Sequence, residues 1–437
     1  MLLVMRIPEI QSLVSQRLLK KMSLVHKPLH IATATCTLLG VISTACPAHE
    51  WHRPHDASGT PIESPGFSIP EEAGSDPDNA ADVAERAGAF APFFPEVRVR
   101  WDGTWLYVES NGMPNHGMMA GITNWQQQVG IPQNYYADNA WQIPLNPELS
   151  DNPISTRDNL FRGAIALAVN GVPIFNALNN RGEDAFLIGE LDDWGGHAGR
   201  ADDYHYHAAP LHLQDIVGDD APIAYALDGY PIYGLKEPDG SEVVGLDEYN
   251  GHFGPGYHYH ASLIYPYING GLRGVITVEG GQVEPQPGTR GVRPATTPLR
   301  DAEIISYETQ GESGHSILYT YNNQSYTFSW STDETAETAT FSLINPGGSV
   351  TSNTYSGWVV PPEFAGHSLE VISSGSGLLS FSISGEPGMA YPFASSTDLG
   401  AWQRLGFLQL GDDGKQSFDL NTSDTTGFIR ITGKLTD

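Results

Sequence analysis

The amino-acid sequence predicts a mostly β fold, in which an internally duplicated β-domain is followed by a β-sandwich module. Three observations lead to this fold class. Two stretches about fifty residues apart carry the same pattern, and short alternating apolar runs, spaced by Gly, Asn, Ser and Pro, fill the chain after Asp301. No amphipathic helix of convincing period occurs beyond the amino-terminal segment. Short strands at such regular spacing are typical of sandwiches.

Residues 1–48 are predicted to be a signal peptide. Basic residues precede an uncharged run from Ile31 to Ala45, and small residues follow it, which is the order found in secretion signals. The run is shorter than the about 20 apolar residues needed to cross a bilayer, so the mature chain should have no transmembrane segment. Cys46 resembles the lipidated cysteine of bacterial lipoproteins, which leaves lipid attachment open. We therefore expect a secreted or cell-surface protein.

Residues 49–91 are predicted to form a disordered acidic tether, because Pro, Ser, Gly, Asp and Glu dominate them. A short helix at Ala80–Ala89 is the one ordered element expected there. The whole chain carries a formal net charge of −29. Such an acidic chain repels nucleic acids and anionic membranes, so neither is expected as a partner.

The structured part should begin with a β-hairpin and span residues 92–280. The alternating run VRVRW starts at Val97, and Asp102-Gly103 supplies a turn before TWLYV. Two copies of one unit are predicted inside this domain, at residues 163–210 and 221–263. Their beginnings, IALAVNGVPIF from Ile165 and IAYALDGYPIY from Ile223, match at nearly every position.

Each copy is expected to open with a tight hairpin. Asn170-Gly171 and Asp228-Gly229 are favoured pairs for a two-residue turn with positive φ at both central positions. Three further segments are predicted, namely a closing strand at 272–279, a linker at 281–300 and a β-sandwich-like module at 301–437. The end of that module resembles a β-module common at the carboxyl ends of large secreted bacterial proteins.

Six of the fifteen histidines fall at matched positions in the two copies. Leu191–Ala208 reads LDDWGGHAGRADDYHYHA, and Leu246–Ala261 reads LDEYNGHFGPGYHYHA. Each stretch holds a Gly-His and then a Tyr-His-Tyr-His. The matched residues are His197, His205, His207, His252, His258 and His260.

These histidines have the spacing of metal ligands. Alternate side chains of a strand share a face, so each His-x-His is a two-ligand clamp, and the loop histidine, flanked by glycines, could add a third. Three imidazoles are a usual set for catalytic zinc, and copper accepts the same donors. We therefore expect a zinc or copper ion as cofactor, either at one site per copy or at a single shared site. Hydrogen-bonded structural strands and metal-free catalysis are the alternatives.

His116 is a separate candidate catalytic residue. It lies in the Gly- and Pro-containing loop NGMPNHG before the first copy, where a positioned polar residue often serves function. It would act as an extra ligand or a general base, and an exposed loop histidine is the alternative interpretation.

The two Tyr-His-Tyr-His strings resemble the YHYH domain family of secreted and surface proteins. The element DGYPIYG from Asp228 and the Pro-Asn-His loop ending at His116 contribute to the resemblance, which covers roughly Pro92–Gly280. This family is named for its motif rather than for an activity. The resemblance therefore implies an extracellular module and no catalytic residue.

Two classes of function remain open from the sequence. In the first, a metal-activated water attacks an extracellular ester, phosphate or glycosidic substrate, or copper performs redox chemistry beside a tyrosine of the motif. In the second, the protein is a non-enzymatic binding or surface-matrix protein, its partner is a surface polymer, and the YHYH strands are structural. The tyrosines concerned are Tyr204, Tyr206, Tyr257 and Tyr259.

Overall fold

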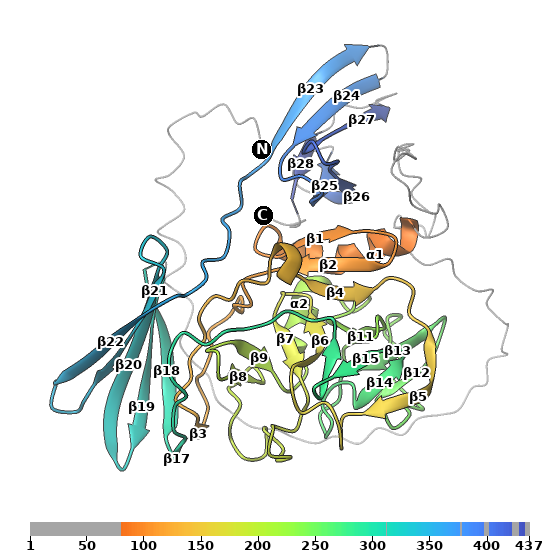
Figure 1. Ribbon diagram of the computed structural model, residues 1–437. Coiled ribbons are helices and arrows are strands. Elements are labelled where there is room, and N and C mark those ends of the chain that lie inside the picture. The colour runs from red at the N-terminus through yellow and green to blue at the C-terminus, as the bar shows by residue number, and fades with distance from the viewer. Residues whose placement is uncertain (1–79, 312, 376–377, 397–401, 422–427, 433–437) are drawn as a thin grey trace, which may run out of the picture. The chain divides into compact units, whose positions relative to one another are not determined.

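The computed structural model describes residues 80–437 except 312, 376–377, 397–401, 422–427 and 433–437 (Figure 1). The predicted signal peptide and most of the predicted tether lie outside the described residues. Short strands in several, mainly antiparallel, sheets make up most of the described chain, so the predicted mostly β fold class is confirmed. None of the helices in this described part is long and apolar enough to cross a bilayer.

A helix, α1 (Ala80–Phe90), and a 3₁₀ turn, η1 (Ala91–Phe93), precede the first strand. The helix falls where the sequence predicted one. Phe90 is buried and stacks on Tyr225, with the ring centroids 5.8 Å apart. The helix therefore lies inside the predicted tether, and its residues are not disordered as the sequence predicted.

The predicted amino-terminal hairpin is present and belongs to a larger sheet. β1 pairs with β2, β2 pairs with β4, and β25 lies on the other side of β1, where it also pairs with β26 and β28. An ion pair between Arg98 and Glu386, 3.2 Å long, lies beside the contact of β1 with β25. Strands from the end of the chain thus complete a sheet begun near residue 98. The bounds are β1 (Arg98–Trp101), β2 (Trp105–Glu109), β4 (Trp141–Pro144), β25 (Ala390–Ser396), β26 (Gln403–Gln409) and β28 (Phe428–Ile431).

The strand order of the central sheet is β12-β13-β11-β10-β6-β7-β9-β8. From either edge inward, the Gly-His strand comes first, then the histidine strand, and then the two strands of a hairpin. In each half, a hairpin leads to a strand that runs parallel to the histidine strand, which pairs antiparallel with a Gly-His strand. The first half holds β6 (Ala164–Ala168), β7 (Pro173–Phe175), β8 (Gly196–Ala198) and β9 (Tyr204–Tyr206). The second half holds β10 (Ala224–Ala226), β11 (Pro231–Tyr233), β12 (Gly251–Phe253) and β13 (Tyr257–His260).

The two halves meet where β6 pairs antiparallel with β10. Leu167 faces Tyr225 across this pair, and these two residues are equivalent positions of the predicted repeat. An antiparallel pair in which equivalent residues face each other has a local two-fold axis through it. The two halves are therefore related by a two-fold rotation, while duplication as their origin stays a prediction.

The two hairpins have three-residue loops, so the predicted two-residue turns are wrong. The Gly171 N–H donates to the Ala168 carbonyl, and the Ala168 N–H donates to the Val172 carbonyl. Positive φ occurs at Gly171 (78°) and Gly229 (93°), and not at the residue before either glycine. This pattern is that of a type I turn followed by a residue in the left-handed conformation. The reason is that the preceding Asn170 and Asp228 point inward and bind tyrosine hydroxyls.

Short strand pairs surround the central sheet. The single closing strand predicted at 272–279 is instead two short strands in different pairs, β14 and β15. The pairs are β5 (Leu149–Ser155) with β14 (Gly271–Gly274), β15 (Thr277–Glu279) with β16 (Gln282–Glu284), and β3 (Asn124–Trp125) with β17 (Leu299–Arg300). The short helical turns are η2 (Ala137–Asn139), η3 (Leu211–Leu213) and α2 (Gln214–Val217).

The chain after Asp301 forms a five-stranded antiparallel sheet and a three-stranded one. Trp330, on the middle strand of the first, is buried and donates its indole N–H to the Gly130 carbonyl at 2.8 Å. The five strands are β18 (Glu303–Gln310), β19 (Gly314–Tyr321), β20 (Gln324–Asp333), β21 (Thr338–Ile344) and β22 (Val350–Ser356). The three are β23 (Ser368–Gly375), β24 (Leu378–Ser384) and β27 (Lys415–Asn421).

Replacing Gly229 by alanine should destabilise the fold more than replacing Gly240. Both glycines have positive φ, which costs an alanine about 1–2 kcal/mol. A Cβ at Gly229 would lie 2.7 Å from the Pro144 carbonyl oxygen, whereas nothing lies within 4 Å of a Cβ at Gly240. The clash should add roughly 1–3 kcal/mol. Urea unfolding of Gly229→Ala and Gly240→Ala checks this, and equal midpoints would contradict the close approach.

Candidate metal centres

The first triad consists of His197, His205 and His207. His197 on β8 lies directly opposite His205 on β9, and His207, two residues further, shares the face of His205 because side chains alternate along a strand. The Nε2 atom of His207 lies 3.1 Å from the Nε2 atoms of both His197 and His205. Three imidazole nitrogens therefore converge on one point.

The second triad, His252, His258 and His260, repeats this arrangement at the other edge of the sheet. His252 on β12 lies opposite His258 on β13, and their Nε2 atoms are 3.0 Å apart. A carboxylate joins them, since the oxygens of Glu237 lie 3.0 Å from the Nε2 of His252, 3.3 Å from that of His258 and 3.4 Å from that of His260. Among the described residues, these four and the first triad are the groups that could hold a metal ion.

The structure therefore places one group in each half. Figure 1 shows β8 and β9 at one edge of the central sheet and β12 and β13 at the other. Five strand spacings separate β9 from β13, which is about 24 Å at 4.8 Å per spacing. Of the two arrangements that the sequence left open, the triads correspond to one site per copy and not to a shared one.

Backbone carbonyls set the tautomer of the imidazoles. In the first triad, Nδ1 of His205 lies 3.0 Å from the Asp203 carbonyl oxygen, and Nδ1 of His207 lies 2.5 Å from that of Asn176. A carbonyl oxygen only accepts, so each Nδ1 carries the proton and each Nε2 carries a lone pair. The second triad has the same pattern, with His252 bonded to Val244, His258 to Gly256 and His260 to Gly234.

The converging nitrogens could hold a cation, either a metal ion or a proton on one of the imidazoles. Burial lowers the pKa of His197 well below its usual value and that of His207 to about 3, so an imidazolium does not supply the charge. Nitrogens bound tetrahedrally to zinc at about 2.0–2.1 Å stand about 3.3 Å apart, close to the separations observed. In the second triad, the buried Nε2 of His260 has no hydrogen-bond partner among the described atoms, as expected for a ligand atom.

The tyrosines of the motif point away from the histidines and anchor the strands. The Tyr204 hydroxyl donates to Asp192, and the Tyr257 hydroxyl donates to Asp247, both at 2.8 Å. Burial raises the pKa of Asp192 to about 6, although backbone N–H groups also bond to it. These hydroxyls are bonded to carboxylates on the face opposite to the histidines. The described structure therefore gives no support to copper redox chemistry beside a tyrosine of the motif.

The glycine before each loop histidine makes room for a tyrosine. A Cβ on Gly196 would lie 2.4 Å from the Tyr204 hydroxyl, and one on Gly251 would lie 2.2 Å from that of Tyr257. The Gly-His pairing in the sequence therefore reflects a close crossing of tyrosine and backbone, where only a residue without a side chain fits.

His116 lies on the tyrosine side of the strand and not with the first triad. Its Nε2 lies 2.7 Å from the Tyr206 hydroxyl, and its ring stacks on Trp194 with the centroids 4.5 Å apart. Burial lowers the pKa of His116 to about 4. The six matched histidines are thus brought together in two triads. His116 belongs to neither triad and contacts Tyr206, on the opposite face of the strand from the first triad.

The two triads differ in whether a carboxylate lies beside the three Nε2 atoms. Position 237 of the second half corresponds to Asn179 of the first half, and Asn179 donates instead to Glu190 at 3.2 Å. No carboxylate of the described residues joins the converging Nε2 atoms of the first triad, although Oδ2 of Asp203 lies 3.6 Å from Nδ1 of His205. The first triad faces a cavity of about 360 Å³, to which residues of the predicted linker contribute. The sequence analysis did not predict Glu237 as a ligand. The signal that could have found it is the alignment of the two copies, in which Glu237 stands where the first copy has Asn179.

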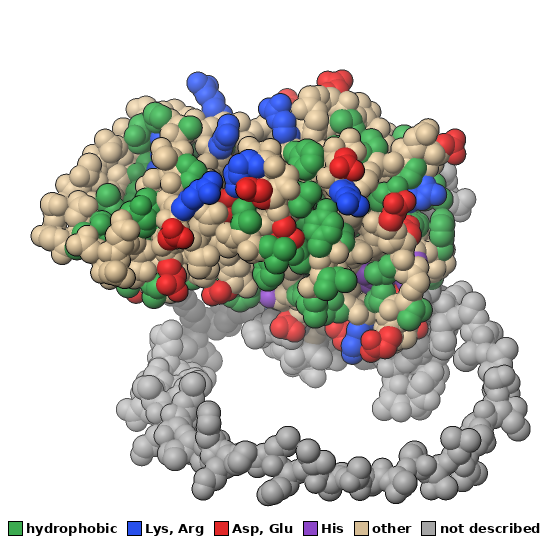
Figure 2. Space-filling model, turned by 90° about the horizontal axis from the view of Figure 1, so that it is seen from below, with side chains coloured by type: hydrophobic (Ala, Val, Ile, Leu, Met, Phe, Trp, Pro, Cys, Tyr) green, Lys and Arg blue, Asp and Glu red, His purple; other side chains and the backbone are tan. Residues whose placement is uncertain are grey.

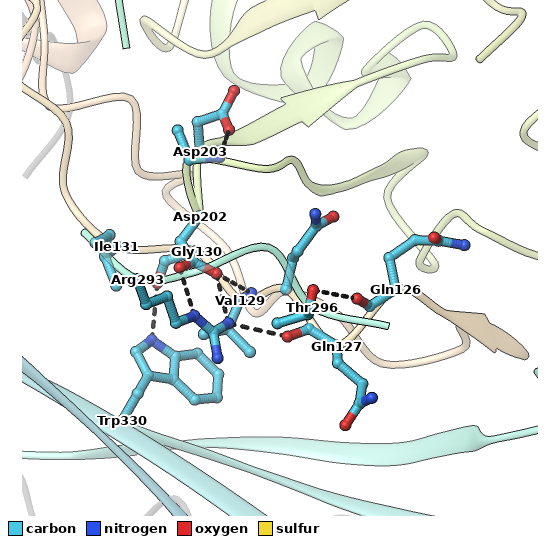
Figure 3. A network of polar contacts seen from close by, with 12 residues as sticks. Gln126, Gln127, Val129, Gly130, Ile131, Asp202, Asp203, Arg293, Thr296 and Trp330 are labelled. Carbon is cyan, nitrogen blue, oxygen red and sulfur yellow. Dashed lines mark hydrogen bonds and ion pairs between the residues drawn. The ribbon is translucent and has the colours of Figure 1, made fainter. Parts of the chain in front are cut away.

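The linker predicted at 281–300 forms a wall of this cavity. Arg293 binds both carboxylate oxygens of Asp202, at 2.6 and 2.7 Å, in the turn that precedes the histidine strand (Figure 3). Thr296, which lines the cavity, donates to the Gln126 carbonyl at 2.7 Å. In the face drawn in Figure 2, histidine side chains appear only as small purple areas, in keeping with their buried positions.

Comparison with family models finds one match, to the family described as YHYH protein, over residues 140–242. The match confirms the predicted resemblance for this region. It includes the first triad and Glu237, and it ends before the second triad. No curated protein and no solved structure matches the chain.

Acid should destabilise the metal-free protein partly through His207. The pKa of His207 is about 3 in the folded protein and 6.5 in a model peptide. Between these two pH values, the unfolded chain binds a proton at His207 and the folded protein does not. Stability is therefore lost as the pH falls from about 6.5 towards 3, by about 1.4 kcal/mol per pH unit for this group. Urea unfolding with a chelator from pH 7 to pH 4 should show a shallower decline for His207→Gln, and parallel profiles would contradict the assignment.

Proposed function

We propose that the protein binds a transition-metal ion, zinc or copper, at each triad, and that the first triad is the active centre of an exported metal-dependent hydrolase. One observation carries this proposal. At the first triad, three imidazole Nε2 atoms converge on a point that faces a cavity, and no fourth ligand from the described residues fills the remaining position.

The contrast between the triads supports different roles for them. Catalytic zinc sites have three protein ligands and an open position, whereas structural sites have four. Glu237 gives the second group a fourth ligand, so the second ion would stabilise the edge of the sheet. The first triad keeps the open position, so a substrate could reach the ion there.

An ion at the first triad would lower the pKa of its bound water to about 7, which makes hydroxide available for hydrolysis of an ester, phosphate or glycosidic bond. The chain holds and orients the ligands. The carbonyls of Asp203 and Asn176 fix two rings, and Phe175 stacks on His205 with the centroids 4.0 Å apart. Such contacts with ligands typically raise metal affinity by 10- to 100-fold.

A non-enzymatic surface protein is the second candidate. Exposed hydroxyl pairs cross from β21 to β22, between Thr340 and Thr354 at 2.9 Å and between Ser342 and Ser352 at 2.8 Å. These pairs give one face of the five-stranded sheet an ordered polar surface that a polymer could contact. In this alternative both ions would be structural.

Elemental analysis of the purified protein tests the two sites. The wild type should hold two ions per chain, while His205→Ala and His258→Ala should each hold one, because each change removes a ligand from one triad. His116→Ala should still hold two and serves as the control. Equal metal content in the wild type and in the double variant would end the metal proposal.

Hydrolysis assays separate the two candidate functions. The zinc-loaded protein should cleave at least one of three chromogenic probes, an ester, a phosphate ester or a glycoside. His205→Ala should lower the rate at least about 100-fold, because the variant loses the ion of the first triad, whereas Glu237→Gln should keep most of it. Two bound ions without any hydrolysis would favour the surface protein.

A further inference from the structure

We propose that the cavity at the first triad binds an oxyanion, a phosphate or carboxylate group of the substrate, and that Arg200 recognises it. This inference rests on the proposed ion at the first triad. It adds the substrate class and a specificity-determining residue to that site.

Apart from the histidines, three charged side chains line the cavity: Arg181, Arg200 and Glu190. Glu190 is 1% exposed, and its carboxylate forms an ion pair with Arg181. It also accepts hydrogen bonds from Gln126 at 2.8 Å and from Asn179 at 3.2 Å. Arg181 forms a second ion pair with the exposed Glu183. Glu190 is thus held by Arg181 and two amides, and it is not free to act as a base.

Arg200 is the remaining charge in the lining. It is exposed, and among the described residues no carboxylate lies within ion-pair distance of it. Its position is close to the triad, because it follows Gly199, where a Cβ would lie 2.8 Å from the Cε1 atom of His205. A guanidinium presents a planar pair of donors that matches a carboxylate or phosphate.

Nearby acids do not neutralise this charge. Asp202, two residues after Arg200, has both oxygens bonded to Arg293 of the predicted linker (Figure 3). Asp203 is directed to the backbone N–H of Ala201 at 3.0 Å. The carboxylates on this turn are thus engaged by other partners, which leaves the Arg200 guanidinium to meet a ligand.

The ion would add further uncompensated charge. Three neutral imidazoles leave a divalent ion with its full charge, whereas Glu237 offsets part of it at the second triad. The cavity would then be a positive site in a chain whose formal net charge is −29. A concave site of one charge concentrates ligands of the opposite charge. Neutral glycosides would leave these charges unmatched, so a phosphate ester or a carboxylate-bearing ester fits best.

Side-chain amides complete the recognition surface. Gln128 and Asn180 also line the cavity, and each amide offers two N–H donors. An oxyanion that spans the ion and Arg200 has enough oxygens to accept from them as well. The volume of about 360 Å³ lies at the small end of ligand pockets, which suits a small acid group with part of its substituent.

The experiment uses the full chain with cobalt in place of zinc, because the visible spectrum of cobalt reports changes at its open position. Inorganic phosphate should shift the spectrum of the wild type. The shift should be absent in His205→Ala and present in His258→Ala. Arg200→Gln should weaken phosphate binding by roughly 10- to 100-fold, the effect of one charge-assisted contact. Arg157→Gln, a change of an exposed arginine outside the cavity, should bind as the wild type does.

Acetate in place of phosphate separates the two sources of the oxyanion. Tighter binding of phosphate assigns a phosphoryl substrate, and tighter binding of acetate assigns a carboxylate, provided that Arg200→Gln weakens the preferred anion. Equal affinity in Arg200→Gln and Arg157→Gln, or no spectral shift with either anion while cobalt occupies the first triad, overturns the oxyanion proposal alone. Absence of cobalt from the first triad overturns the proposed function and, with it, this inference.

Discussion

The hydrogen bonds from imidazole Nδ1 to backbone carbonyls are the constraint on which the site depends. They fix the proton on one nitrogen of His205, His207, His258 and His260 and leave the other as a lone pair. Two lone pairs about 3 Å apart repel, and burial makes protonation unfavourable in the first triad. A fold that brings three imidazole nitrogens to one point, in two places, is suited to hold a metal ion at each point.

Strand alternation explains why tyrosine and histidine occur together. The same short strand directs its histidines to the triad and its tyrosines to buried carboxylates on the other face, as with Tyr259 and Asp228 at 2.6 Å. The histidines alone would leave the strand free to shift along its neighbour. Because a shift by one residue would exchange the two faces, the tyrosine contacts hold the register in which the imidazoles converge.

Local patterns predicted much of this molecule. Alternation and the His-x-His spacing predicted the strands and the shared face of each histidine pair, and the match between copies predicted equivalent environments. Contacts that depend on distant parts of the chain left no local signal. Nothing near position 390 predicts that β25 pairs with β1, and nothing in the linker predicts that Arg293 binds Asp202. The turn type was wrong for a related reason, because Asn170 is held by the distant Tyr206 hydroxyl.

The two halves of the sheet differ at one pair of equivalent positions beside the triads. A carboxylate at position 237 and an amide at position 179 occupy equivalent places, yet the amide is held by Glu190, whose charge is met by Arg181. Simply placing a carboxylate at position 179 would bring a second negative charge beside Glu190. A carboxylate ligand for the first triad would therefore require changes at several residues together, because Asn179 is held by Glu190. The two-fold arrangement alone does not produce this difference, which leaves the first triad without a carboxylate beside its Nε2 atoms among the described residues.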